Sequence, residues 1–82
     1  MYKATITITL RTSILDPQGK AAHQALQNLG MDSINRVRIG KSIELDIEAA
    51  NEKMAQSVAD EAARKLLANE VMEDYQIEIE SV

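Results

Sequence analysis

The strongest constraint on the fold of this chain is the alternation of apolar and polar residues in four separate runs. In the first run, residues 2–10, the apolar positions are Ala4, Ile6, Ile8 and Leu10, and the polar positions between them are Lys3, Thr5, Thr7 and Thr9. Period-two alternation rich in β-branched residues predicts a strand with one buried face. The same period recurs over residues 35–39, 43–47 and 74–80. We therefore expect four strands, each with one apolar face.

Two stretches between these runs carry helical spacing instead. The first begins at Asp16 and Pro17, an N-cap followed by a proline at the first helical position, and ends at Gly30. Its apolar stripe consists of Ala22, Ala25, Leu26 and Leu29. The second runs from an N-cap at Asn51 to Leu67, with the stripe Ala55, Val58, Ala59, Ala62 and Leu66. Both stretches are expected to be amphipathic helices that pack on the sheet.

The register of the predicted central hairpin follows from which residues face each other when its loop has an odd or an even number of residues. A three-residue loop, residues 40–42, places Val37 opposite Leu45, whereas a two-residue loop would place Val37 opposite Glu44. The longer loop keeps both faces of the hairpin consistent, so it is the expected one. It also predicts two cross-strand ion pairs, Arg38–Glu44 and Arg36–Asp46.

The order β-α-β-β-α-β, with an apolar face on every strand, predicts an α+β fold in two layers. We expect a four-stranded, antiparallel-type sheet in the ferredoxin-like order 4-1-3-2, with both helices on one face. The 82 residues are expected to form a single domain, residues 1–82. A domain of this size buries only about 60–65% of its unfolded surface, so association would add stability.

Composition and charge exclude several function classes. The net charge of −4 disfavours nucleic-acid binding, and the polar sheet face offers threonines and charges rather than aromatic rings for bases. With no cysteine and one histidine, the chain cannot build the common zinc sites. No signal-peptide core and no run near the roughly 20 apolar residues of a membrane span is present. We therefore expect a soluble, cytoplasmic protein without nucleic-acid or membrane partners.

A search for catalytic groups finds no nucleophile paired with a base. Ser13 has no positioned base near it in the sequence, and His23 stands alone on the first predicted helix, as expected of a surface or edge residue. The pattern of a Gly-rich phosphate loop or of a calcium loop is absent. The segment Arg11-Thr12-Ser13 leaves two interpretations open. It is an ordinary connector, or it holds an anion near a helix N-terminus, which Asp16 would oppose.

Three segments in combination resemble one protein family. They are Leu15-Asp16-Pro17-Gln18-Gly19-Lys20, Val37-Arg38-Ile39-Gly40-Lys41, and Lys65-Leu66-Leu67-Ala68-Asn69 with its continuation through Val71 to Glu73-Asp74-Tyr75. Together they resemble the PurS family, the small subunit of bacterial and archaeal phosphoribosylformylglycinamidine (FGAM) synthase. The resemblance covers essentially the whole chain, and Glu70 departs from the proline of many relatives.

The resemblance implies a role in de novo purine biosynthesis. FGAM synthase makes formylglycinamidine ribonucleotide from formylglycinamide ribonucleotide, ATP and glutamine. A large subunit, PurL, performs the ATP-dependent amidation of this ligase, and a glutaminase subunit, PurQ, releases ammonia. The small subunit is implied to be a homodimer or tetramer without catalytic residues or a cofactor of its own, while the assembled complex uses ATP, magnesium and glutamine. The implied function is to dock the glutaminase on the synthetase and to support ammonia transfer.

Two regions are the candidate partner contacts, the helix entry and the hairpin tip, with Asp16, Gln18 and Gly19 in the first and Arg38, Gly40 and Lys41 in the second. A purely structural role stays open for each. The main alternative function is a ferredoxin-like regulatory domain that binds a small molecule, with which Gly30 is compatible. A second alternative is a small phosphatase that holds phosphate with Arg11, although the connector lacks a glycine for the backbone nest.

Overall fold

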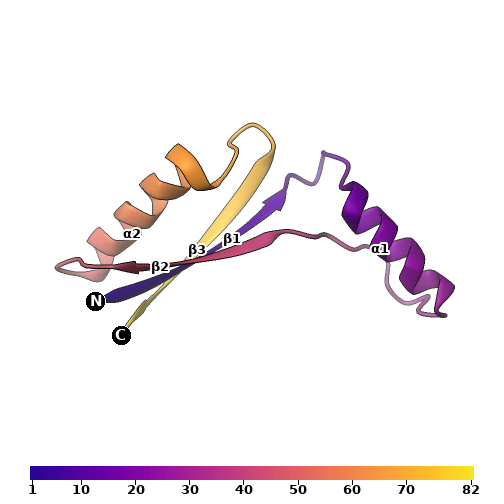
Figure 1. Ribbon diagram of the computed structural model, residues 1–82, viewed down its shortest axis with the longest axis horizontal. Coiled ribbons are helices and arrows are strands. Elements are labelled where there is room, and N and C mark those ends of the chain that lie inside the picture. The colour runs from indigo at the N-terminus through magenta and orange to yellow at the C-terminus, as the bar shows by residue number, and fades with distance from the viewer.

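A computed structural model describes residues 1–82 and contains three strands and two helices. The elements in chain order are β1 (Tyr2–Leu10), α1 (Pro17–Asn28), β2 (Lys41–Ile47), α2 (Glu52–Ala62), a π-helical turn η1 (Ala63–Leu67) that continues α2, and β3 (Glu73–Ser81). The strands form one antiparallel sheet in the order β2-β1-β3 (Figure 1). The first and last predicted strands and both predicted helices are confirmed, including the N-caps Asp16 and Asn51.

The core lies between this sheet and the helix formed by α2 and η1 (Figure 1). The side chains with no exposed surface come from the middle of β1 and from one line of the helix: Ala4, Ile6, Ile8, Ala55, Ala59 and Ala63. Alanines four residues apart lie on the same helix face, and their small side chains let the helix approach the sheet closely. The alternation that predicted β1 is therefore the alternation that builds the core.

Two residues of the stripe predicted for the second helix do not face the core. Val58 is 47% exposed and Leu66 is 82% exposed, so this part of the prediction is wrong. The buried line follows the alanines at four-residue spacing, which turns Val58 outward. At the end of the helix, Leu67 packs against the core cluster instead of Leu66.

The central hairpin does not form, and the prediction of four strands is wrong. Residues 35–40 run directly into β2 without a turn and extend past the end of the sheet (Figure 1). Gly40 does not have the positive φ that favours glycine in a turn. Its backbone instead lies against β1, where a Cβ would overlap the carbonyl oxygen of Ile8. The three observed strands keep their predicted neighbours, and only the second predicted strand is missing from the sheet.

The predicted cross-strand ion pairs are also absent. Glu44 pairs with Lys3 on β1, with Nζ and Oε2 2.9 Å apart. The antiparallel register sets Thr5 opposite Glu44, and Lys3, two residues from Thr5, lies on the same face of the sheet. Arg38 donates to groups at the end of β1 rather than to a carboxylate.

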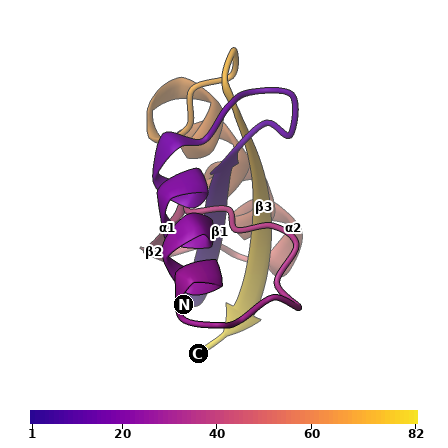
Figure 2. The ribbon, with the colours of Figure 1, turned by 90° about the vertical axis from the view of Figure 1, so that its right-hand side faces the viewer.

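Helix α1 does not pack on the sheet, so the predicted layer of two helices on one face is wrong for the single chain. Because the chain does not turn at Gly40, residues 35–40 and the helix beside them lie beyond the end of the sheet (Figure 1). Seen from that end, α1 stands in front of the sheet (Figure 2). We call residues 16–40 the arm. It gives the molecule its extents of 50 × 27 × 13 Å.

The substitution Gly40→Ala tests this path of the chain. It is expected to lower the free energy of unfolding by about 1–3 kcal/mol, because the new Cβ would overlap the Ile8 carbonyl oxygen and force the backbone apart. Urea unfolding measures the loss, with Gln24→Ala on the exposed face of α1 as the control. A loss below about 0.5 kcal/mol would indicate an open loop at Gly40 and contradict the structure.

Candidate functional site

The arm is fixed at its root by the carboxylate of Asp16. One oxygen accepts a hydrogen bond from the Ile39 N–H at 2.9 Å, and the other accepts from the Gly19 N–H at 3.0 Å and caps α1. The bonds from Ile39 and then Gly19 hold the pKa of Asp16 below its usual value of 3.8. A single side chain thus joins the start of α1 to the extended segment 35–40.

Helix α1 and the extended segment approach each other closely at two further points. A Cβ at Gly19 would overlap the carbonyl oxygen of Val37, so glycine is the residue that lets the helix come this near. Farther along, Nε2 of His23 donates to the carbonyl oxygen of Ile34 at 2.7 Å. This contact gives the lone histidine a structural role. The arm is therefore one packed unit rather than a free helix.

Arg38 ties the arm to the sheet. Its Nη2 donates to Oγ1 of Thr9 at 2.9 Å and to the carbonyl oxygen of Leu10 at 2.6 Å, both at the end of β1. Since β1 ends at Leu10, Arg38 supplies a partner for a carbonyl that the sheet leaves free. The position of the arm relative to the sheet is held by this side chain and by the passage of Gly40 over Ile8.

The six candidate contact residues lie together around the root of the arm. Asp16, Gly19 and Arg38 border a cavity of about 450 Å³, and Gln18, Gly40 and Lys41 border a hollow of about 260 Å³. The two regions named from the sequence, the helix entry and the supposed hairpin tip, are thus neighbours in space. Their role as partner contacts stays a prediction.

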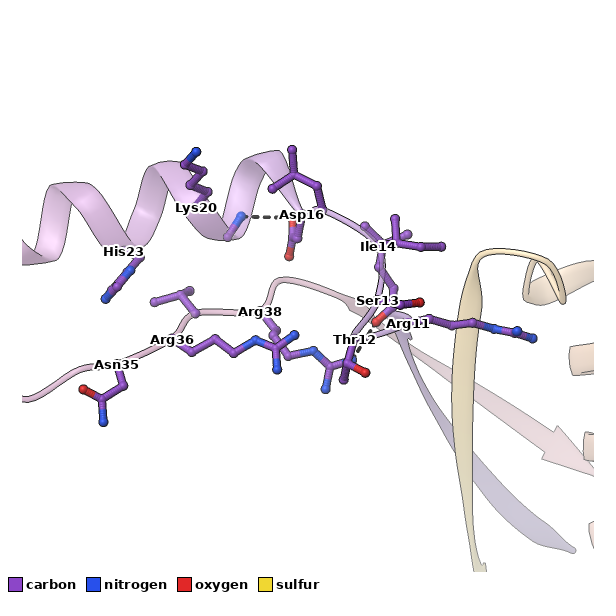
Figure 3. Close-up of a pocket in the computed structure, with 14 residues that line it drawn as sticks. Arg11, Thr12, Ser13, Ile14, Asp16, Lys20, His23, Asn35, Arg36 and Arg38 are labelled. Atoms are coloured by element: carbon purple, nitrogen blue, oxygen red, sulfur yellow. Dashed lines mark hydrogen bonds between the residues drawn. The ribbon is translucent and has the colours of Figure 1, made fainter.

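The cavity of about 450 Å³ is basic in a chain whose net charge is −4. Its lining includes Arg11, Lys20, His23, Arg36 and Arg38, and its single carboxylate is that of Asp16 (Figure 3). One signal for this clustering was visible in the sequence, the alternate arginines of segment 35–39. Nothing in the sequence indicated that the connector, residues 11–15, lies close to that segment. This proximity arises because the chain does not turn at Gly40.

Arg11 borders this cavity but is engaged elsewhere. Its guanidinium donates to the carbonyl oxygen of Glu70, and its Nε lies 3.6 Å from Oδ1 of Asp74. In Figure 3 its side chain points away from Arg36. Arg11 therefore anchors the connector to the start of β3, and this geometry does not support a phosphatase in which Arg11 holds the substrate.

A polar cluster that sequence reasoning missed holds α2 on β3. The hydroxyl of Tyr75 donates to Oδ1 of Asp60 at 2.7 Å, and Nε of Arg64 donates to Oδ2 of the same carboxylate at 2.9 Å. The bond from Tyr75 and then the bond from Arg64 lower the pKa of Asp60. The four-residue spacing of Asp60 and Arg64 on the second helix was the available signal.

The rest of the surface offers apolar contact area rather than reactive groups. No cluster of three or more His, Asp or Glu side chains is placed to hold a metal ion, and no helix is long and apolar enough to cross a membrane. However, Leu15, just before the arm, is 68% exposed, and Leu29 on the arm is 74% exposed. By fold, the chain is a small α+β protein with large apolar side chains exposed at and beside its arm.

Comparison with known proteins identifies the family. The protein-family model described as PurS, phosphoribosylformylglycinamidine (FGAM) synthase, matches residues 3–81. The phosphoribosylformylglycinamidine synthase subunit PurS of Synechocystis is 49% identical over 78 residues, which cover 95% of this chain and 78% of that protein. The chain belongs to the PurS family, so the resemblance seen in the sequence is confirmed.

Solved structures agree with this assignment along the whole chain. The crystal structure of Methanocaldococcus jannaschii PurS, one of the subunits of formylglycinamide ribonucleotide amidotransferase, matches with a TM-score of 0.90 and 38% identity, covering 100% of this chain and 99% of that one. A chain in the structure of PurLQS from Thermotoga maritima matches with a TM-score of 0.88 and 30% identity, covering 96% of each. The open arm is therefore part of a fold that matches solved PurS structures over nearly its full length.

The role of Asp16 predicts a pH-dependent difference between the wild type and Asp16→Asn. Because the pKa of Asp16 is lowered in the folded state, its stabilisation is complete above the usual value of 3.8 and is lost as the pH falls through the lower, folded value. The variant should be less stable than the wild type by a constant amount above about pH 5, and the gap should close in more acid solution. Urea unfolding at stepped pH measures it.

The control for this experiment is Asp32→Asn, which changes an exposed carboxylate on the loop after α1. It should follow the wild type at every pH. A gap between wild type and Asp16→Asn that persists unchanged at about pH 2 to 3 would show that the charge of Asp16 does not hold the arm.

Proposed function

We propose that this chain is the non-catalytic small subunit of an FGAM synthase complex in de novo purine biosynthesis. It docks a PurQ-type glutaminase on a PurL-type synthetase and supports the transfer of ammonia between them. The observation that carries the proposal is the match of the whole fold, arm included, to a chain of the Thermotoga maritima PurLQS structure. The exposed apolar side chains are in keeping with a subunit that contributes surfaces.

Docking assists this chemistry without a catalytic group from the small subunit. Ammonia that escapes into water at neutral pH becomes ammonium, which has no lone pair with which to attack the activated substrate. A subunit that closes the junction between glutaminase and synthetase excludes water from the path of ammonia. ATP, magnesium and glutamine are bound by the other two subunits, and the complex works in the cytoplasm, where these compounds are available.

The shape of the chain supports a homodimer as the unit that docks. Its accessible surface is 5890 Å², whereas a compact monomer of 9.1 kDa exposes about 4,900 Å². Its radius of gyration is 16.0 Å, against about 12 Å for a compact domain of this length. The surplus of about 1,000 Å² is comparable to the roughly 800 Å² that each partner buries in a stable protein–protein interface.

A second copy of this chain fits the uncovered surfaces. On the apolar face of the sheet, Ile43 and Leu45 of β2 are only half-buried, while the residues of β1 beside them are fully buried under α2. In the proposed dimer, α1 of one copy lies on the β2 side of the other copy's sheet, next to α2. The layer of two helices that the sequence predicts within one chain is then completed between two chains, as in domain-swapped dimers.

The dimer is tested with Leu29→Arg. The wild type is expected to elute with twice the 9.1 kDa chain mass in gel filtration with light scattering, and a charge in place of the exposed Leu29 should shift the variant toward the monomer. Gln56→Arg on the exposed surface of α2 is the matched control and should remain a dimer. A monomeric wild type, or two variants that behave alike, would contradict the proposed interface.

The predicted partner contacts at the root of the arm are tested with Lys41→Glu. Lys41 is exposed at the start of β2, and reversal of its charge is expected to weaken binding to the PurL–PurQ pair by at least about tenfold. Co-elution of the three purified subunits measures binding, with Lys53→Glu on α2 as the control. Normal binding of Lys41→Glu would remove this residue from the interface. Failure of the wild type to join the complex would overturn the docking function.

A further inference from the structure

The unpaired cations of this chain gather at one cavity. Of its nine lysines and arginines, four form ion pairs with carboxylates: Lys3, Arg11, Arg64 and Lys65. The five that form none are Lys20, Arg36, Arg38, Lys41 and Lys53. Three of these five, Lys20, Arg36 and Arg38, line the cavity of about 450 Å³ at the root of the arm. Positive charge without a partner is thus concentrated in a hollow of an otherwise acidic protein.

The single carboxylate in the lining forms no ion pair with these cations. Both oxygens of Asp16 accept hydrogen bonds from backbone N–H groups, those of Gly19 and Ile39. Asp16 forms no ion pair with Arg36 or Arg38, although it borders the same cavity. Two arginines therefore remain available to an anion that enters from solvent.

The two arginines reach the same part of the cavity. They are two residues apart on an extended segment, so their side chains leave the backbone on the same side. In Figure 3 both side chains run from segment 35–38 toward Thr12 on the connector. Only Nη2 of Arg38 is used by the end of β1, which leaves the rest of its planar fork free. Thr12 and Ser13, both exposed, add hydroxyl groups at the same edge.

From this arrangement we propose that the cavity binds a phosphate group, either free phosphate or the phosphate ester of a small molecule. Planar guanidinium groups match phosphate oxygens with paired hydrogen bonds, and hydroxyl groups supply further donors. The volume falls within the range of small-molecule sites, about 300–1,000 Å³. The anion site left open at Arg11-Thr12-Ser13 is thus kept, with Arg36 and Arg38 in place of Arg11 as the cations. The inference is independent of the docking function and involves no chemical step.

Nuclear magnetic resonance titration of the 82-residue chain tests the site. Inorganic phosphate and ribose 5-phosphate are added separately at constant ionic strength, and amide shifts are followed. The expected result is a saturable response confined to residues 11–13 and 35–38. Arg36→Gln should weaken the affinity about tenfold, because it removes a charge-assisted pair of hydrogen bonds. Lys53→Gln, which removes an equally unpaired cation on α2, should leave the affinity unchanged.

The two ligands distinguish the sources of the phosphate. Equal affinities indicate a site for the free anion, and preference for the ester indicates a phosphorylated metabolite. Either result supports the proposal when Arg36→Gln weakens the binding. Thr12→Val, which keeps the size of the side chain and removes its hydroxyl, should weaken binding as well. The proposal is overturned if neither ligand gives a saturable response. It is also overturned if Arg36→Gln and Lys53→Gln weaken phosphate binding equally, which would indicate diffuse charge attraction.

Discussion

The structure depends on the straight passage of residues 35–47 through Gly40. Gly40 has no Cβ, so its backbone can lie close to the Ile8 carbonyl oxygen. Segment 35–40 therefore runs straight into β2 from beyond the end of β1, and does not pair with β2 as a hairpin. Every other unusual feature follows from this. Segment 35–40 leaves the sheet, α1 goes with it because Asp16 bonds to both, and the sheet keeps three strands and one helix. One side of the apolar layer, at Ile43 and Leu45, is left only half-covered within the single chain.

The two halves of the molecule are held in different ways. The sheet half has an apolar core built from β1 and a line of alanines, closed at its end by the bonds of Asp60 to Tyr75 and Arg64. The arm has no core of its own, and it is held by polar contacts at Asp16, His23 and Arg38. A half fixed by hydrogen bonds, with Leu29 exposed on it and Leu15 exposed just before it, is suited to burial against another protein.

Local structure was predictable from the sequence wherever local chemistry decides it. The alternation in β1 and β3 and the caps at Asp16 and Asn51 each depend on a few neighbouring residues. The path at Gly40 was not predictable, because the same alternation over 35–39 and 43–47 suits a hairpin within one chain and an open run whose apolar face is buried elsewhere. The basic cavity and the position of α1 depend on that path, so they could not be predicted either. Family resemblance supplied the function that the residues alone left open.

The central claim is that a chain without catalytic groups is needed only to couple ammonia release to its use. The most direct measurement combines the PurL and PurQ subunits with and without this chain and follows FGAM formation from glutamine and, in parallel, from ammonium salts. The claim predicts that glutamine-dependent formation requires the chain, while ammonia-dependent formation proceeds at a similar rate without it. Equal glutamine-dependent rates with and without the chain would contradict the claim, and so would an equal loss of both activities.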